Sequence, residues 1–370
     1  MQLSNIISRI RGESQTVGID IGHRLIKVAV VAHKPGEKGE LLALEQELLP
    51  DGVLVDNEIK NAAVLIEKLQ TVLNRALPLG LNGDFILAIN WTSGVLCDRM
   101  LVKPVPKVSE NELILQAAMG RSPFDDAGNV IDYSVIEHRE EGIEAMIVAA
   151  KNSALTAWVN LFQALNIKLA AIDIDAFALG NSFTASAQLA AGSDLPPEGE
   201  EDNSTLLLNF GYSKAYVAYI KDGRFSTARS IFGGAFQNLQ EQMSGPLNIT
   251  PEKCGEILID PSVKIADIDD DRIKSTKEFV FEEISMKLDT ALRYFSSADN
   301  YSRPSKMILS GGGANILGLD IFLADRLSLD VKVLSPFGAV QIDQNRFRGT
   351  DWAKISCIYS VALGLALRKF

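Results

Sequence analysis

One pattern of hydrophobic and polar positions occurs twice in the chain, about half a chain apart. The first copy covers residues 16–33 and the second covers residues 204–225. Each copy has the pattern of a buried apolar strand, a tight turn with glycine, and a second strand. Helical periodicity follows at residues 59–77 and 155–165. The pattern predicts an α/β protein in which a strand–turn–strand unit is duplicated.

Three further segments complete the predicted organisation. An apolar strand at residues 169–174 leads into a helix at Asp175, and this helix continues to residue 191. The stretch 191–204 is rich in proline, glycine and acidic residues, which indicates a boundary between two domains. We expect an irregular excursion at 260–277 and a helix at 282–296.

A third glycine-rich element lies at residues 307–327. A short apolar strand meets Gly311, Gly312 and Gly313, and an amphipathic helix is expected directly after them. Such a junction presents backbone N–H groups to an anion or to a closely approaching ligand. A simple tight turn would explain the three glycines equally well.

Composition and charge exclude several classes of protein. The 370 residues suit about two domains. The formal net charge of −11 argues against broad nucleic-acid binding. The three cysteines and three histidines are scattered, which speaks against a disulfide framework or a metal site built from these residues. We expect a cytoplasmic protein with no transmembrane span, because no apolar run reaches about 18–20 residues.

The first residues carry one further signal. Residues 3–11 have apolar residues at helical spacing beside two arginines. They form either a short helix that touches a membrane surface or partner, or a terminal helix docked on its own domain.

The two predicted turns suit phosphate binding if they face each other across a cleft. A glycine lets the backbone approach a phosphate without a clash at Cβ. An acidic residue at the end of the preceding strand can hold a metal-bound water.

These motifs resemble those of the actin-like ATPase superfamily. The order is Asp20-Ile-Gly22 with Lys27, then Asn209-Phe-Gly211, then Ser310 followed by three glycines. Across nearly the whole chain the sequence resembles the type IV pilus assembly protein PilM family, whose members are relatives of FtsA. The resemblance implies an α/β, two-lobed actin-like fold of the duplicated ribonuclease H type, with an inserted small α+β subdomain in lobe one. Lobe one would cover residues 1–190, with the inserted subdomain at about 100–150, and would also include the C-terminal helix at 350–370. Lobe two would cover residues 204–349.

The resemblance also implies a site for ATP with Mg²⁺. The implied nucleotide-binding residues are Asp20, Gly22, His23, Arg24 and Lys27 in the first loop, Asn209, Gly211, Tyr212 and Ser213 in the second, and Gly233, Gly234, Lys287, Gly311, Gly312 and Gly313 nearby. Asp20 would hold the metal through water. His23 and Arg24 are bulky where relatives have small hydroxyl residues, and Asn209 stands where active relatives have aspartate. A neutral amide holds metal-bound water less strongly than a carboxylate does, so ATP binding is expected to be weak or absent.

Two acidic residues and one lysine leave alternatives open. Asp175, or Asp173 beside it, either orients a catalytic or metal-bound water, or Asp175 caps the helix that it begins. Lys27 either contacts phosphate or is a solvated surface charge.

The resemblance further implies a partner, the cytoplasmic tail of a PilN-like inner-membrane protein. The implied contacts are Leu113, Ile114, Ala117, Met119 and Phe124, although amphipathic core packing would explain the same pattern. Where relatives have tyrosine-isoleucine-proline-phenylalanine, this chain has Arg121-Ser-Pro-Phe124. A pilus motor ATPase and self-association are further possible interactions, and the protein would lie at the inner membrane through its partner.

Four functions follow from these observations. The first is a scaffold with a degenerate ATP site. The second is an active ATPase, the third is a polymerising FtsA-like protein, and the last is a sugar kinase, for which no sugar-binding residues stand out.

Overall fold

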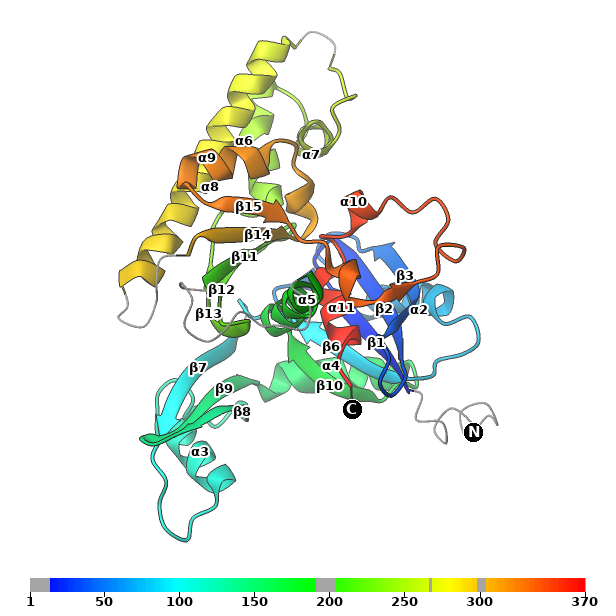
Figure 1. Cartoon of the computed structure of the whole chain (residues 1–370). Helices are drawn as coiled ribbons and strands as arrows, with labels where there is room; N and C mark the ends of the chain where they lie inside the picture. Colours follow the sequence, from blue (N-terminus) through cyan, green and yellow to red (C-terminus); the bar gives the residue numbers. More distant parts are fainter. Residues whose placement is uncertain (1–13, 93, 191–203, 266–267, 298–303, 370) are drawn as a thin grey trace.

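The computed structural model describes residues 14–92, 94–190, 204–265, 268–297 and 304–369. The predicted segment 3–11 and most of the boundary at 191–204 lie outside these residues. Two large sheets form the centres of two lobes, and a smaller sheet projects from the first lobe (Figure 1). Among the described residues, no helix combines the length and apolarity that crossing a bilayer requires.

The first lobe is built on a six-stranded sheet with the order β10-β6-β1-β2-β3-β16. Its strands are β1 (Ser14–Ile21), β2 (Leu25–His33), β3 (Glu40–Leu48), β6 (Asp84–Ile89), β10 (Leu169–Ile174) and β16 (Gln341–Ile342). A small ribbon of β4 (Leu54–Val55) and β5 (Glu58–Ile59) follows β3. Helices α2 (Ala62–Ala76) and α4 (Asn152–Ala164) bury their apolar side chains with this sheet in one core.

The second lobe repeats the arrangement of the first. Its five-stranded sheet has the order β13-β12-β11-β14-β15, which matches the order β3-β2-β1-β6-β10. Its strands are β11 (Ser204–Phe210), β12 (Ala215–Lys221), β13 (Arg224–Ser230), β14 (Lys306–Ser310) and β15 (Asp330–Val333). The opening strand pairs antiparallel with its successor and parallel with a later strand in both lobes. The predicted duplication and the actin-like fold are therefore confirmed.

Helices cover the second sheet on the side away from the first lobe. They are α6 (Phe236–Leu247), α7 (Pro251–Ile259), α8 (Asp270–Ser297) and α9 (Leu319–Leu327). Apolar side chains of β11, β14, α6 and α8 form one continuous core there.

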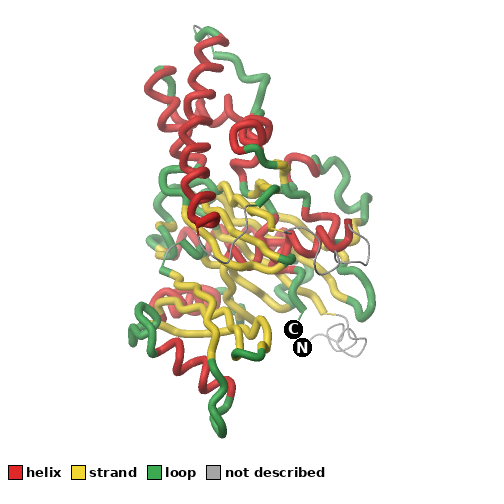
Figure 2. Tube along the Cα trace, turned by 60° about the vertical axis from the view of Figure 1, so that its left-hand side comes forward, coloured by secondary structure: helices red, strands yellow, loops and turns green. Residues whose placement is uncertain are grey.

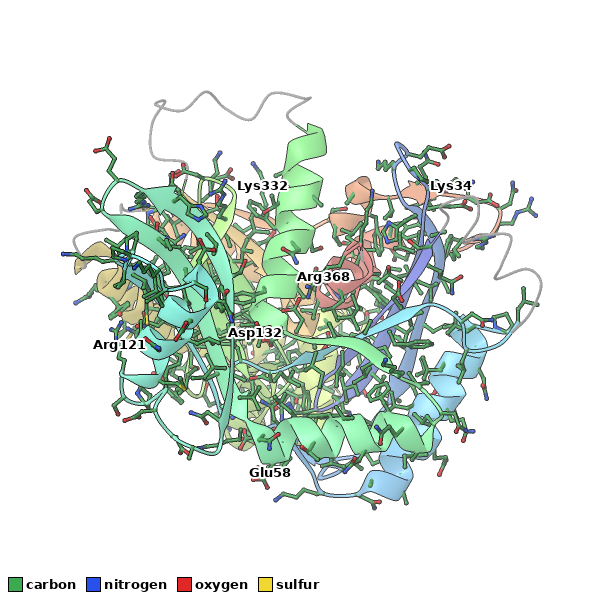
Figure 3. The ribbon with its side chains drawn as sticks, turned by 90° about the horizontal axis from the view of Figure 1, so that it is seen from below. Lys34, Glu58, Arg121, Asp132, Lys332 and Arg368 are labelled. Atoms are coloured by element: carbon green, nitrogen blue, oxygen red, sulfur yellow. The ribbon has the colours of Figure 1, made fainter. Side chains whose placement is uncertain are left out.

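Helices α5 (Asp175–Ala190) and α11 (Ser360–Ala366) lie side by side between the two sheets (Figure 1). A shared core joins both lobes around them, with Ile86 from the first sheet, Leu207 and Ile220 from the second, and Leu365 from α11. The two helices approach so closely that a Cβ on Gly364 would lie 1.8 Å from the carbonyl oxygen of Ala178. The C-terminal end is also fastened to β10, because Arg368, near the centre of Figure 3, donates a hydrogen bond to Asp173.

The inserted subdomain has a three-stranded sheet, β7-β9-β8, and one helix. Its elements are β7 (Val95–Val102), α3 (Glu110–Met119), β8 (Asn129–Arg139) and β9 (Gly142–Lys151). Figure 2 shows it at the end of the molecule opposite α8. Its own apolar core includes Ile114, Phe124 and Ile147.

Three sequence predictions were wrong in detail. Helix α8 begins at Asp270, so part of the expected excursion at 260–277 is helical. A 3₁₀ turn, η1 (Gly312–Asn315), contains the last two of the three glycines, and α9 begins only at Leu319. The chain returns to the first sheet before residue 350, because Gln341 and Ile342 pair with β3 after the turn η2 (Pro336–Ala339). A short helix, α10 (Trp352–Ile355), then precedes α11.

The contact at Gly364 predicts a large effect of a single methyl group. Gly364→Ala should lower the free energy of unfolding by about 1–3 kcal/mol, the usual cost of overpacking a tight core, or prevent folding. Gly245→Ala, in α6, is the matched control because a Cβ there meets no atom within 4 Å. The control should be neutral or stabilising by up to about 1 kcal/mol. Chemical denaturation measures both, and equal stability of the two variants would contradict the close contact.

Candidate functional site

The two predicted phosphate loops have the same backbone form. In the β1–β2 turn, the N–H of Gly22 donates to the carbonyl of Leu25 at 2.9 Å. In the β11–β12 turn, the N–H of Gly211 donates to the carbonyl of Lys214 at 3.0 Å. Arg24 of the first turn faces the ring of Tyr212 in the second, so the two turns lie opposite each other. We call the region between them, with Asp20, Asp175 and Asn209, the cleft.

Asp20 at the end of β1 forms an ion pair with Lys27. The two residues are direct cross-strand neighbours, and the ammonium group donates to the carboxylate. Their side chains are only 13% and 14% exposed. Lys27 is therefore not a solvated surface charge, and its ammonium group neutralises the carboxylate that was predicted to hold a metal through water.

Asp175 is buried at the start of α5, close to this ion pair. Its carboxylate accepts hydrogen bonds from the N–H of Trp91 at 3.0 Å and from the side chain of Asn90 at 3.3 Å. The pKa of Asp175 is raised to about 7. Burial is the main cause and the charge of Asp20 adds to it, while the hydrogen bond from Trp91 acts in the opposite direction. The carboxyl therefore ties α5 to the end of β6, and a pKa of this kind also suits a general base. Both alternatives for Asp175 remain predictions, whereas Asp173 has a structural partner in Arg368.

Asn209 ends β11 at the position equivalent to Asp20. Tyr216 is its direct cross-strand neighbour, and the buried hydroxyl of Tyr216 has no hydrogen bond of normal geometry. Burial raises the pKa of Tyr216 well above its ordinary value, and the nearby Asp175 carboxyl adds to the rise. The Tyr216 side chain thus lies close to both Asn209 and Asp175.

The second loop is supported by the start of α6. The N–H groups of Phe236 and Gln237 donate to the carbonyls of Gly211 and Tyr212 at 3.0 and 2.8 Å. The turn that precedes α6 contains Gly233 and Gly234, and Lys287 of α8 donates to the carbonyl of Gly233 at 2.7 Å. The predicted residues 233, 234 and 287 therefore lie together next to the second loop.

The glycine triplet also reaches the second loop. A Cβ on Gly311, whose φ is +82°, would lie 2.7 Å from the side-chain oxygen of Asn209. A Cβ on Gly313 would overlap the ring of Phe210 at 2.5 Å, whereas one on Gly312 would meet no atom within 4 Å. Gly311 and Gly313 are thus required by close packing, and Gly312 borders open space.

Two contacts cross the cleft between the loops. The guanidinium group of Arg24 lies 5.9 Å from the centre of the Tyr212 ring. Lys214 forms an ion pair with Asp56 of the first lobe at 2.6 Å. His23 is partly buried beside them, and burial followed by the charge of Lys214 lowers its pKa. The bulky residues of the first loop therefore occupy the space that small hydroxyl residues would leave open.

The cleft fits the phosphates of a nucleotide better than it fits a magnesium ion. The buried hydroxyl oxygen of Ser213 has no hydrogen-bond partner, and Arg24, Lys27 and Lys214 are cationic. The acidic groups are less suited to a metal, because Lys27 neutralises Asp20 and burial raises the pKa of Asp175 to about 7. No cluster of three or more potential metal ligands occurs in the described part of the chain.

Sequence reasoning missed three residues of this cleft. Lys214 directly follows the predicted site residue Ser213, so its position in the loop could have marked it as a site residue. Its partner Asp56 could not be recognised in the sequence, because only folding brings the two residues together. Tyr216 looked like an ordinary strand residue.

The predicted partner-binding residues do not share one environment. Ile114 is fully buried and Phe124 is 4% exposed, so both pack in the core of the inserted subdomain and are not available to a partner. Leu113 and Ala117 are partly buried against that core, whereas Met119 is 55% exposed. The amphipathic-core alternative therefore explains Ile114 and Phe124.

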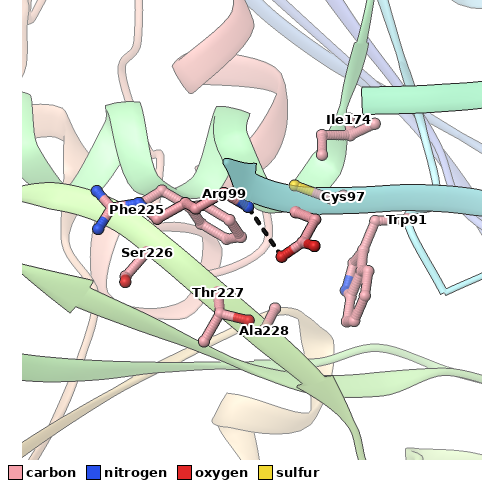
Figure 4. Close-up of a pocket in the computed structure, with 9 residues that line it drawn as sticks. Trp91, Cys97, Arg99, Ile174, Phe225, Ser226, Thr227 and Ala228 are labelled. Carbon is pink, nitrogen blue, oxygen red and sulfur yellow. Dashed lines mark hydrogen bonds between the residues drawn. The ribbon is translucent and has the colours of Figure 1, made fainter. Parts of the chain in front are cut away.

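A recess of about 400 Å³ lies where the inserted subdomain meets the second lobe. Its lining residues come from β7, β8, β9, α5 and β13: Arg99, Ser134, Val135, Ile136, Met146, Phe177, Arg224 and Phe225. A smaller cavity of about 50 Å³ continues from it and shares Arg99 and Phe225 (Figure 4). The N–H of Arg99 donates to the carboxylate of Asp98 there, at 2.9 Å. No sequence pattern indicates this recess, because residues more than 80 positions apart form it.

Comparison with known proteins agrees with this architecture. The solved structure titled "PilM-PilN type IV pilus biogenesis complex" is 22% identical, with a TM-score of 0.77 over 95% of this chain and 98% of that chain. The ethanolamine utilization protein EutJ from Carboxydothermus hydrogenoformans is 13% identical, with a TM-score of 0.52 over 95% of this chain and 89% of that chain. The sequence model of the family described as "Type IV pilus assembly protein PilM" matches residues 18–370. The chain therefore belongs to the type IV pilus assembly protein PilM family.

Proposed function

We propose that the protein is a PilM-like scaffold that binds a short cytoplasmic segment of a PilN-like inner-membrane protein. The observation that carries the proposal is the recess between the inserted subdomain and the second lobe. The similar fold in a complex titled with both PilM and PilN supports the choice of partner. Such binding would hold the protein at the inner membrane through its partner.

Edge strands make the recess suitable for an extended peptide. β8 is an edge strand of the three-stranded sheet, and β13 is an edge strand of the five-stranded sheet. Ser134, Val135 and Ile136 of β8 and Phe225 of β13 line the recess. An edge strand offers backbone groups that can pair with an added strand, while pockets between side chains give specificity.

The recess also has a defined chemical character. Val135, Ile136, Met146 and the rings of Phe177 and Phe225 provide apolar contacts, and the two rings pack edge to face with their centres 4.8 Å apart. Arg99 and Arg224 provide positive charge, although Arg99 also lies 3.6 Å from the carboxylate of Glu144. An extended, mainly apolar segment with an acidic group near one end would match this lining.

We further propose that nucleotide binding is weak and that the chain is not an efficient ATPase. The charge of the cleft supports this view, because Asn209 is neutral and Asp20 is already paired with Lys27. An active ATPase remains the alternative function, with Asp175 as the base. Polymerisation like that of FtsA, self-association and a pilus motor ATPase as a second partner stay hypotheses.

Filling the recess should abolish partner binding. Ser134→Trp places a bulky ring in the recess, so affinity for a peptide with the cytoplasmic segment of a PilN protein from the same organism should fall at least about tenfold. Val130→Trp, on the same face of β8 four residues away, is the control and should bind normally. Calorimetry measures both. Loss of binding in Met119→Glu but not in Ser134→Trp would place the partner on α3 instead.

A single change at Asn209 should restore metal-dependent binding. In the wild type, ATP should bind weakly and with little dependence on Mg²⁺. In Asn209→Asp, the added carboxylate should strengthen binding about tenfold with Mg²⁺ present, because it can hold metal-bound water. Asn345→Asp adds the same charge at an exposed site away from the cleft and should change nothing. Tight Mg²⁺-dependent binding with steady turnover in the wild type would refute the proposal.

A further inference from the structure

Two ion pairs hold the cations Arg24 and Lys214 of the two phosphate loops. Arg24 of the first loop forms an ion pair with Asp51 at 3.4 Å and faces the ring of Tyr212. Lys214 of the second loop forms an ion pair with Asp56 at 2.6 Å. Each pair combines a cation from a phosphate loop with an acidic residue from the segment 51–57, which we call the acidic segment.

The acidic segment is anchored deep in the cleft. Asn57 donates to the carbonyl of Asn90 at 2.7 Å and accepts from its N–H at 3.0 Å. The side chain of Asn90 in turn donates to Asp175. The segment therefore runs from the mouth of the cleft, where its two carboxylates meet the cations, to the start of α5.

The two ion pairs are accessible to an incoming ligand. The side chains of Arg24 and Lys214 are 41% and 37% exposed, and those of Asp51 and Asp56 are 73% and 51% exposed. Ion pairs with this exposure contribute little to stability. A triphosphate carries several negative charges and many acceptor oxygens, so it binds a guanidinium or ammonium group more strongly than one carboxylate does.

We propose that Arg24 and Lys214 are phosphate ligands of the nucleotide, and that Asp51 and Asp56 compete with phosphate for them. The inference rests on the proposed binding of nucleotide in this cleft. Phosphate takes the two cations from the acidic segment, so nucleotide binding releases the contact between residues 51–57 and the second lobe. Arg24 and Lys214 thus supply positive charge to the phosphates. A metal ion held by an aspartate at position 209 would otherwise supply that charge.

Charge substitutions with matched controls test this exchange. Calorimetric titrations use ATP and inorganic tripolyphosphate in the presence of EDTA, with thermal melting to check that each variant is folded. Lys214→Met should weaken binding of both anions about tenfold. Asp56→Asn should strengthen binding of both about two- to fivefold, because it removes the competitor.

The controls lie on the neighbouring ribbon. Glu58 and Lys60 pair with each other there, so Glu58→Gln and Lys60→Met make the same charge changes outside the two loops. Both should leave the affinities unchanged. Equal effects in test and control variants would overturn the inference, since net charge alone would then act.

The remaining outcomes separate this inference from the proposed function. One result is that the wild type binds ATP and that neither Lys214→Met nor Asp56→Asn changes the affinity. This result would overturn the exchange and leave nucleotide binding intact. No binding of either anion to the wild type or to Asp56→Asn would overturn both the exchange and the nucleotide site. Binding of the PilN segment is unaffected by that result and is measured separately.

Discussion

The close contact between α5 and α11 determines how the two lobes meet. At Gly364 the backbone of α11 approaches that of α5 without space for a side chain. At Gly18 the same helix approaches β1, since a Cβ there would lie 2.0 Å from the carbonyl oxygen of Ala362. Helix α11 is therefore packed between the first sheet and α5. This packing fixes the two duplicated sheets so that their first turns face one another.

The cleft keeps the shape of a nucleotide site but has an altered charge. Asp20 and Asn209 occupy equivalent strand ends in the two lobes, yet one is paired with Lys27 and the other is neutral. Burial raises the pKa of Asp175 to about 7, which disfavours its charged form. Little free negative charge is therefore left for a metal, and Arg24, Lys27 and Lys214 are each paired with a carboxylate. This balance supports the proposal that nucleotide is bound weakly and is not efficiently hydrolysed.

The sequence was most informative about features that are local or repeated. The duplication followed from two apolar strands around a glycine turn, and the strand at residues 169–174 was predicted with the observed bounds. Asp20 and Lys27 were both named as site residues because their turn resembles the first phosphate loop of actin-like ATPases. Contacts between distant segments could not be predicted, as the ion pair of Asp56 with Lys214 illustrates.

Burial was also hard to predict within the inserted subdomain. Ile114 and Phe124 lie on a short amphipathic segment, whose pattern fits a partner surface as well as a core. Which face of this segment is covered depends on the position of the three-stranded sheet. Two strands of that sheet, β8 and β9, come later in the chain. The recess arises in the same way, since β8 and β13 both line it but lie far apart in the sequence.

The cleft and the recess are connected through the first turn of α5. Asp175 faces the cleft, and Phe177, two residues later, lines the recess and packs on Phe225. Partner binding at the recess, as proposed, would therefore act on the same helical turn that holds Asp175. Hydrogen exchange of the full chain with and without the PilN segment tests this account most directly. The account predicts slower exchange at residues 134–136, at 224–226 and in the first turn of α5. Slower exchange confined to α3, with no change at these three places, would contradict it.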